Sequence, residues 1–173
     1  LTKVTGKDLN NDDEIAPDVN YKGVQKNVLT EGRYFYNIYN YSWSVYPMVE
    51  VPEGKMGIRI RLHGDDLGYG DFVAVEDKQK GIVKEVLRPG RYPINAIVKD
   101  KDPNGNWSII TPRKKNDYAE IVELHDPVSI NAGYKGIICN LAGPMPEDPN
   151  QLLVPVGFRG AQHDTLSEGT YYM

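Results

Sequence analysis

Apolar and polar residues alternate along several short stretches of the chain, which predicts β-strands with one face in solvent. Two valines flank a glutamate at 49–51, and a Pro-Glu-Gly turn follows. Residues 57–64, GIRIRLHG, then place three apolar side chains on one face of a strand and Arg59, Arg61 and His63 on the other. We therefore expect a hairpin over 49–64 with the two arginines and the histidine on its surface.

A second pattern follows at 80–95, KGIVKEVLRPGRYPIN. Its apolar spacing would also suit a helix, but Gly81 in the middle would cost a helix about 1 kcal/mol. The Pro-Gly pair at 89–90 favours a tight turn. We therefore predict strand, turn and strand, with Tyr92 packed across the sheet and its hydroxyl at the edge.

The same phrases recur along the chain. The stretch at 49–94 aligns with 128–173 at one constant offset in residue number, 79, and without a gap, so that Gly81, Gly90 and Tyr92 correspond to Gly160, Gly169 and Tyr171. An earlier copy, KGVQKNVLTEGRYFYN at 22–37, matches only the second half of this unit, at an offset of 58. The chain therefore contains half a unit, a whole unit and most of another.

This repeat defines the expected organisation. We predict an all-β fold of tandem small antiparallel modules with little or no helix and a period of about 79 residues. Residues 1–20 are polar and acidic and are predicted to be a flexible lead-in. Residues 21–47 form a partial first unit, 48–126 a full unit, and 127–173 a second copy truncated at its C-terminus.

Glycines recur at the turns of this pattern, where they supply backbone conformations that other residues avoid. The predicted structural turn glycines are Gly23, Gly32, Gly54, Gly57, Gly81, Gly90, Gly133, Gly136, Gly160 and Gly169. Between the second and third copies, WSII and YAEIVEL are typical of strands, and DPNGN at 102–106 is typical of a hairpin tip.

Composition limits the function more than it defines it. The net charge of −4 gives no drive toward nucleic acid. No run of apolar residues is long enough to span a bilayer, and the chain begins with Leu and ends within a repeat, so we expect a fragment of a longer protein whose anchor lies outside it. A short basic stretch, PRKKN at 112–116, is interpreted as a solvated turn.

Few residues suggest chemistry, and no catalytic residue, metal or cofactor is predicted. His63, His125 and His163 each lie near an acid, but none has a histidine in the neighbouring copy, so we interpret them as surface residues. Cys139 aligns with Ile60, which predicts a buried and inert thiol. Asp100, Asp102 and Asn104 open a calcium-loop pattern, but position twelve is Thr111 where a glutamate is required, so they are weak calcium candidates.

The turn motifs resemble those that lead into SPFH (band-7) proteins, the stomatin, prohibitin and flotillin group. Pro52, Gly54 and Gly57 match one motif, and the segment 87–95 matches most of another, although no proline follows Asn95. Vault shell proteins have similar glycine-turn repeats. The resemblance implies a non-catalytic scaffold that forms large homo-oligomers and holds membrane proteins or proteases as clients. It would be attached to a membrane through segments outside this chain, and the side of the membrane on which this part lies is unknown. The alternative is an extracellular β-repeat module that binds calcium or carbohydrate.

Overall fold

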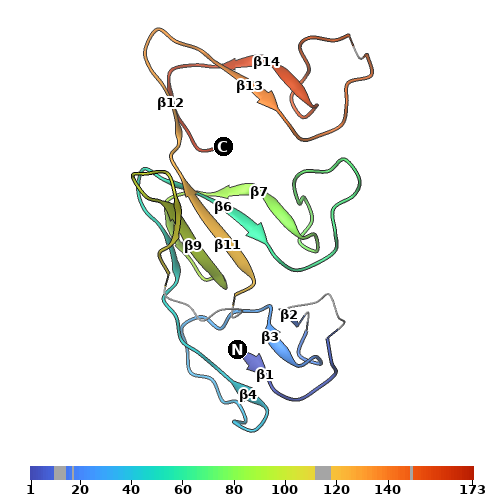
Figure 1. Cartoon of the computed structure of the whole chain (residues 1–173), viewed down its shortest axis with the longest axis vertical. Coiled ribbons are helices and arrows are strands. Elements are labelled where there is room, and N and C mark those ends of the chain that lie inside the picture. The colour runs from blue at the N-terminus through green and yellow to red at the C-terminus, as the bar shows by residue number, and fades with distance from the viewer. Residues whose placement is uncertain (10–14, 17, 112–117, 149) are drawn as a thin grey trace.

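The computed structural model describes residues 1–9, 15–16, 18–111, 118–148 and 150–173. Fifteen short strands and no helix are found among these residues, so the all-β prediction is confirmed. The strands form three tiers stacked along the long axis of the molecule, with the N-terminal tier at one end and the C-terminal tier at the other (Figure 1). The described residues thus contain no helix that could cross a membrane.

The middle tier is the most complete. Strands β6 and β7 form a hairpin within a five-stranded sheet of the order β10-β9-β11-β6-β7, while β5 and β8 pair separately. The predicted hairpin over 49–64 is therefore wrong, because β5 pairs with β8 and not with β6. All pairings in this tier are antiparallel except that of β9 with β11. The strands are β5 (Val49–Val51), β6 (Met56–Arg61), β7 (Gly81–Leu87), β8 (Gly90–Tyr92), β9 (Ala96–Lys101), β10 (Trp107–Ile109) and β11 (Glu120–His125).

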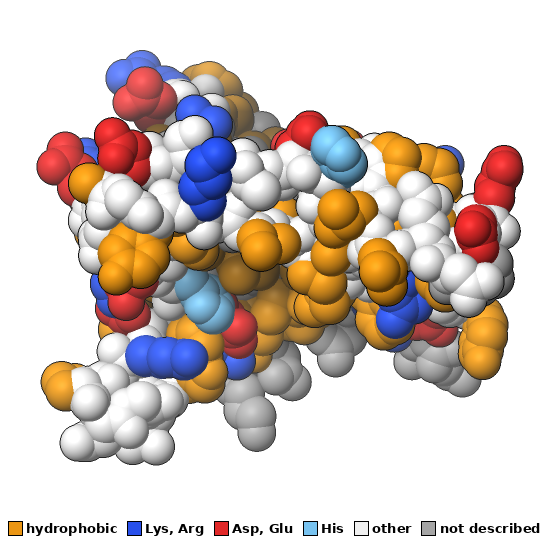
Figure 2. All heavy atoms as spheres, turned by 90° about the horizontal axis from the view of Figure 1, so that it is seen from above, with side chains coloured by type: hydrophobic (Ala, Val, Ile, Leu, Met, Phe, Trp, Pro, Cys, Tyr) orange, Lys and Arg blue, Asp and Glu red, His pale blue; other side chains and the backbone are white. Residues whose placement is uncertain are grey.

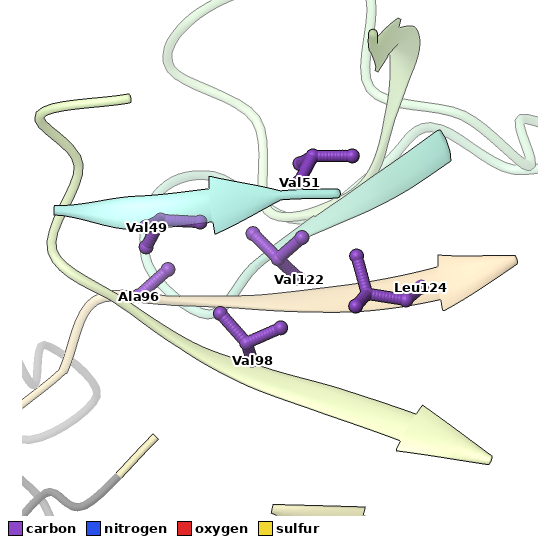
Figure 3. Close-up of a cluster of buried hydrophobic side chains, with 6 residues drawn as sticks. All are labelled: Val49, Val51, Ala96, Val98, Val122 and Leu124. Carbon is purple, nitrogen blue, oxygen red and sulfur yellow. The ribbon is translucent and has the colours of Figure 1, made fainter. Parts of the chain in front are cut away.

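The main hydrophobic core lies inside this tier. Alternate side chains of β5, β9 and β11 point toward one another between the two sheets (Figure 3). The six buried residues are Val49, Val51, Ala96, Val98, Val122 and Leu124. Because β9 and β11 supply four of the six, the core depends on the segment that separates the second and third sequence copies.

The C-terminal tier repeats two of the strand pairings of the middle tier, those of β5 with β8 and of β6 with β7. It contains β12 (Val128–Ile130), β13 (Gly136–Asn140), β14 (Gly160–Leu166) and β15 (Gly169–Tyr171). Val49 pairs with Tyr92 in the middle tier, and Val128 pairs with Tyr171 here. The hairpin β6/β7 pairs Arg61 with Gly81 and carries a bulge, and β13/β14 pairs Asn140 with Gly160 with a bulge at the same place. All of these positions are related to their counterparts by the offset found in the sequence.

The N-terminal tier begins at the first residue of the chain. It contains β1 (Thr2–Lys3), β2 (Ile15–Ala16), β3 (Gly23–Gln25) and β4 (Tyr41–Ser42) in the order β2-β3-β1-β4. Within the described part of 1–20, for which a flexible lead-in was predicted, β1 pairs on both edges and the two residues of β2 are buried. With only two alternating residues, β1 is too short to be found from periodicity.

Each tier closes a loop between its hairpin strands in the same way. In the middle tier the Asp65 amide donates to the Lys78 carbonyl at 2.7 Å, and the Lys80 amide donates to the Asp65 carbonyl at 2.8 Å. In the N-terminal tier Lys7 bonds Asn20 and accepts from Lys22, each at 2.9 Å. In the C-terminal tier Pro144 lacks an amide hydrogen and only accepts, from Arg159 at 2.9 Å. The loops therefore share one base.

The inner part of these loops corrects the ungapped alignment. Ala74 bridges Val83 in the middle tier, and Val154 bridges Gln162 in the C-terminal tier. Gln162 follows Val83 by 79 residues, but Val154 follows Ala74 by 80. The C-terminal loop therefore has one more residue before Val154 than the middle loop has before Ala74. Both Ala74 and Val154 are buried.

One extended segment passes between neighbouring tiers. Strand β11 pairs with β6 of the middle tier and leads directly into β12, which pairs with β15 of the C-terminal tier (Figure 1). Strand β4 pairs with β1 and leads similarly into β5. The amides of Tyr41 and Glu120 bond to the carbonyls of Asn37 and Asn95 respectively. The middle tier therefore inserts the β9/β10 hairpin between its Asn95 and β11. This insertion lies between the second and third sequence copies, which explains why their offset, 79, is larger than the offset of 58 between the first and second copies.

Candidate functional site

The tyrosine after each turn has one defined role. The hydroxyl of Tyr92 donates to the Arg88 carbonyl at 2.7 Å, and those of Tyr34 and Tyr171 donate to the carbonyls of Thr30 and Ser167 at 3.2 and 3.0 Å. In each case the acceptor carbonyl lies 4 residues before the tyrosine. A Cβ on the preceding glycine, Gly32, Gly90 or Gly169, would come within 3.3 to 3.7 Å of the tyrosine ring. Only the distance at Gly32 is tighter than an ordinary contact, so what the three glycines share is a φ of 144° to 157°, which other residues rarely adopt.

The other predicted turn glycines divide into three groups. Gly54 and Gly133 lie in turns with φ of 77° and 85°, where a side chain would be strained. Gly57 and Gly136 lie inside β6 and β13 rather than in turns, and a Cβ there would press on Val122 and Ile130 at 2.9 and 2.5 Å. Gly23, Gly81 and Gly160 begin β3, β7 and β14. These glycines therefore either adopt a positive φ or lie where a Cβ would collide with a neighbouring side chain.

The arginines of β6 are not on the surface as predicted. Arg61 is 4% exposed and Glu120 on β11 is 7% exposed. Arg59 donates from Nε and Nη2 to the two carboxylate oxygens of Glu120, each at 2.8 Å, and Arg61 Nε lies 3.7 Å from Oε1. The hydrogen bonds to Glu120 raise the pKa of Arg59. Glu120, Val122 and Leu124 share the buried face of β11. Because Glu120 and Val122 lie opposite Arg61 and Arg59, the face of β6 that carries the arginines is the inner one.

Arg61 also fixes the adjacent loop. Its Nη1 donates to the carbonyls of Glu76 and Gln79 at 2.9 and 3.0 Å, and Nη2 contacts Asp77 Oδ1 at 3.3 Å. Lys3, at the equivalent place in the N-terminal tier, donates to the Val19 carbonyl of its own loop. The cation at this position is therefore used for loop anchoring, and its bonds are satisfied within the protein.

The three histidines have unlike surroundings. His63 is half-buried, with Nδ1 3.3 Å from the Ala119 carbonyl oxygen and Nε2 buried without a partner, and this burial lowers its pKa. His125 packs edge-on against Trp107 at 5.3 Å between ring centroids, and His163 is exposed. The surface interpretation is thus wrong for His63. No three His, Cys, Asp or Glu residues in the described part of the chain gather to hold a metal.

Cys139 also departs from its prediction. The thiol lies on the outer face of β13 and is exposed. Ile60, its counterpart on β6, is itself only half-buried. The alignment correctly placed Cys139 in a strand, but the predicted burial failed because the face of β6 that carries Ile60 is not the inner one.

Of the weak calcium candidates, Asp100 lies in β9, and Asp102 and Asn104 lie at the tip of the β9/β10 hairpin. Asp100 Oδ1 is 2.6 Å from Lys55 Nζ, and Asp102 Oδ1 accepts from the amides of Asn104 and Asn106 at 2.9 and 2.8 Å. The hydrogen bonds from Lys55 and Asn106 lower the pKa of Asp100 and Asp102 respectively. Thr111 Oγ1 accepts from the Val98 amide at 3.2 Å. The carboxylates thus stabilise the hairpin, and the basic stretch 112–116 lies outside the described residues.

An open groove lies in the N-terminal tier, with a volume of about 830 Å³. Four aromatic side chains line it, two of which, Phe35 and Trp43, are exposed. The lining includes Val28, Leu29, Tyr34, Phe35, Tyr36 and Trp43. Residues 32–34 correspond to β8, whose partner in the middle tier is β5, and no described strand takes that place here. The groove therefore lies along residues 28–37, beside Trp43.

Comparison with known proteins gives no match: no family model fits the chain, and neither a curated protein nor a solved structure resembles it at a significant level. The function has to be argued from the repeat and its surfaces.

Proposed function

We propose that this chain is a non-catalytic structural region of a membrane-associated, SPFH-like protein that assembles into a large homo-oligomer and organises membrane proteins or proteases. The observation that carries the proposal is the crossing segment, seen as β4 leading into β5 and again as β11 leading into β12. A module joined to the next by a shared strand forms a continuous array, as in other repeat proteins.

The chemistry of the interior supports this role. The charged side chains of Arg59, Arg61 and Glu120 bond to one another and to backbone, and the turn tyrosines bond to backbone carbonyls. Groups committed in this way stabilise a fold and are poorly placed to act on a substrate. Large apolar side chains remain exposed at the sides and ends of the tiers, including Phe35, Tyr39, Tyr69 and Leu152. Such surfaces suit contacts between subunits.

The experiment that tests the proposal is a mass measurement on the full-length protein in detergent, by light scattering coupled to size exclusion and by negative-stain imaging. We expect a single species of many subunits with a closed outline. A clean monomer at micromolar concentration would contradict the proposal.

A binding module is the second candidate, and the aromatic groove is the observation that favours it. Flat aromatic surfaces such as Trp43 and Tyr36 suit stacking against sugar rings. Calorimetric titration of the chain with a panel of oligosaccharides would give saturable heats that Trp43→Ala abolishes and Trp107→Ala on the middle tier does not. Calorimetric titration with calcium, comparing the chain with Asp102→Asn, tests the hairpin-tip site; the scaffold proposal expects no heat from either ligand.

A further inference from the structure

The tip of the β9/β10 hairpin holds a pair of residues with a reactivity of their own. Asn104 and Gly105 lie at this tip, and both are exposed. Among the asparagines of the sequence, Asn104 is the only one that a glycine follows. The backbone nitrogen after an asparagine can attack the carbonyl carbon of the asparagine side chain, and a glycine has no side chain to block that approach. The pair therefore forms a candidate site for loss of the side-chain amide.

Exposure to water does not by itself distinguish this asparagine. Hydrophobic, charged and other groups share the outer surface, as the end view in Figure 2 shows, and Asn37 is exposed as well. The contacts of the side chain do distinguish it. Nδ2 of Asn106 donates to Asp102 Oδ2 at 3.4 Å, whereas no hydrogen bond to the Asn104 side chain is found among the described residues. A Cβ on Gly105 would face open space, so the side chain of Asn104 is free to turn toward it.

Asp102 holds the attacking nitrogen in place. The Gly105 amide donates to the Asp102 carbonyl at 2.9 Å, and the Asp102 amide donates to the Asn106 carbonyl at 2.9 Å. Asp102 Oδ1 accepts from the amides of Asn104 and Asn106 at 2.9 and 2.8 Å. The Gly105 nitrogen must leave its acceptor before it can attack. One hydrogen bond of ordinary strength slows such a step about fivefold.

We propose that Asn104 is a site of spontaneous deamidation and that the hydrogen bonds of Asp102 set its rate. The Gly105 nitrogen gives its proton to water or hydroxide and forms a bond to Asn104 Cγ. The bond from Cγ to Nδ2 breaks, and the amide group takes up a proton and leaves as ammonia. Water then opens the resulting cyclic imide at either carbonyl. One opening leaves aspartate at position 104, and the other leaves isoaspartate, in which the main chain runs through the former side chain.

Both products disturb the hairpin tip. Each places a carboxylate close to that of Asp102, where like charges repel. Isoaspartate also lengthens the main chain, so the amides of Gly105 and Asn106 lose the spacing at which both bond to Asp102. The pairing of Trp107 with Lys101 lies next to this tip, so we expect modification to loosen β10. The site does not depend on the homo-oligomer proposed above, and its failure would leave that proposal standing.

The test incubates the whole folded chain at neutral and at mildly alkaline pH, with the same chain unfolded in guanidinium chloride as the reference. Digestion with trypsin releases residues 102–113, which contain both Asn104 and Asn106. Tandem mass spectrometry with electron-transfer fragmentation then distinguishes asparagine, aspartate and isoaspartate at each position. We expect both products at 104, formed faster at the higher pH, while Asn106 stays unchanged. Conversion in the folded chain should be about fivefold or more slower than in the unfolded chain.

Two variants separate the site from its control. Asn104→Gln should stay unmodified, because its longer side chain closes a cyclic imide far more slowly. Asp102→Ala removes the side-chain acceptor, so the folded variant should convert faster than the parent chain. A retained NMR contact between the rings of Trp107 and His125, whose centroids lie 5.3 Å apart, would show that its hairpin still forms.

The outcomes that overturn the proposal are distinct. Asn104 that stays intact in the folded chain while the unfolded chain converts, or that converts no faster than Asn106, would overturn the site. Equal rates in the folded and the unfolded parent chain would overturn the role of Asp102, whether or not the variant folds. Equal rates in the parent chain and a folded Asp102→Ala variant would overturn that role as well.

Discussion

The buried charge cluster gives the sharpest stability prediction. Replacing Glu120 by glutamine keeps the shape of the side chain but removes the charge that faces two guanidinium groups, one of them on a residue 4% exposed. Removing one partner of a buried pair costs about 3–5 kcal/mol, because the remaining charge stays buried without compensation. The amide oxygen of glutamine still accepts one hydrogen bond, so we expect the lower end of that range, about 3 kcal/mol of the free energy of unfolding.

The assay is urea denaturation followed by circular dichroism, with the midpoint shifting and the slope unchanged. The matched control is Glu50→Gln, which removes the exposed cross-strand pair of Glu50 and Arg91, 3.7 Å apart with side chains 64% and 72% exposed. An exposed pair contributes less than about 1 kcal/mol. If Glu120→Gln cost no more than Glu50→Gln, the cluster would not be an integral part of the fold. The double variant Arg59→Met/Glu120→Gln should be less destabilised than the sum of its single variants.

Single contacts give three further predictions. Tyr92→Phe should lower the free energy of unfolding by about 1 kcal/mol, because the hydrogen bond to the Arg88 carbonyl is lost, and Tyr171→Phe should have a similar effect in urea unfolding. If neither variant changed the free energy of unfolding, the tyrosine hydroxyl would not stabilise the turn. Gly64→Ala should be far more disruptive than Gly54→Ala, because a Cβ at Gly64 collides with the Lys78 carbonyl whereas Gly54 faces open space; equal unfolding midpoints would contradict the shared loop base. Burial lowers the pKa of His63 in the folded state, so the unfolded chain takes up the proton first and stability should fall as the pH drops below about 6.5, until the folded pKa is reached. His63→Gln should flatten that part of the pH dependence in urea titrations at about pH 7.5 and about pH 5.5, and an unchanged slope would refute the assignment.

The strands of the middle and C-terminal tiers could be predicted because they are long enough to alternate and because they occur twice. Gly81 and Gly160 begin corresponding strands, and Tyr92 and Tyr171 close corresponding turns. The hairpin tip at 102–106 was also predictable, since turn residues separate two strand-forming stretches, and β9 and β10 pair across it.

The wrong predictions for the arginines of β6 and for Cys139 have a common cause: the sequence pattern does not show which face of a strand is covered by other elements. Alternation in β6 shows that Arg61 and Ile60 point to opposite sides, but it does not show which side is buried. That is decided by Glu120, on a strand far along the chain from β6, whose charge makes the arginine side the inner one. The role of Lys3 was missed for a related reason, because its strand is very short and its partners lie in β3 and β4.

The claim on which the account depends is that the tiers are copies of one pairing scheme. It is tested most directly by cross-strand nuclear Overhauser contacts in the labelled chain, which report strand register without reference to function. We expect contacts that place Glu50 opposite Arg91 and, at the equivalent place in the C-terminal tier, Ser129 opposite Thr170, together with Thr2 opposite Val24 in the N-terminal tier. A different register in any of these pairs, or an unpaired β1, would contradict the account.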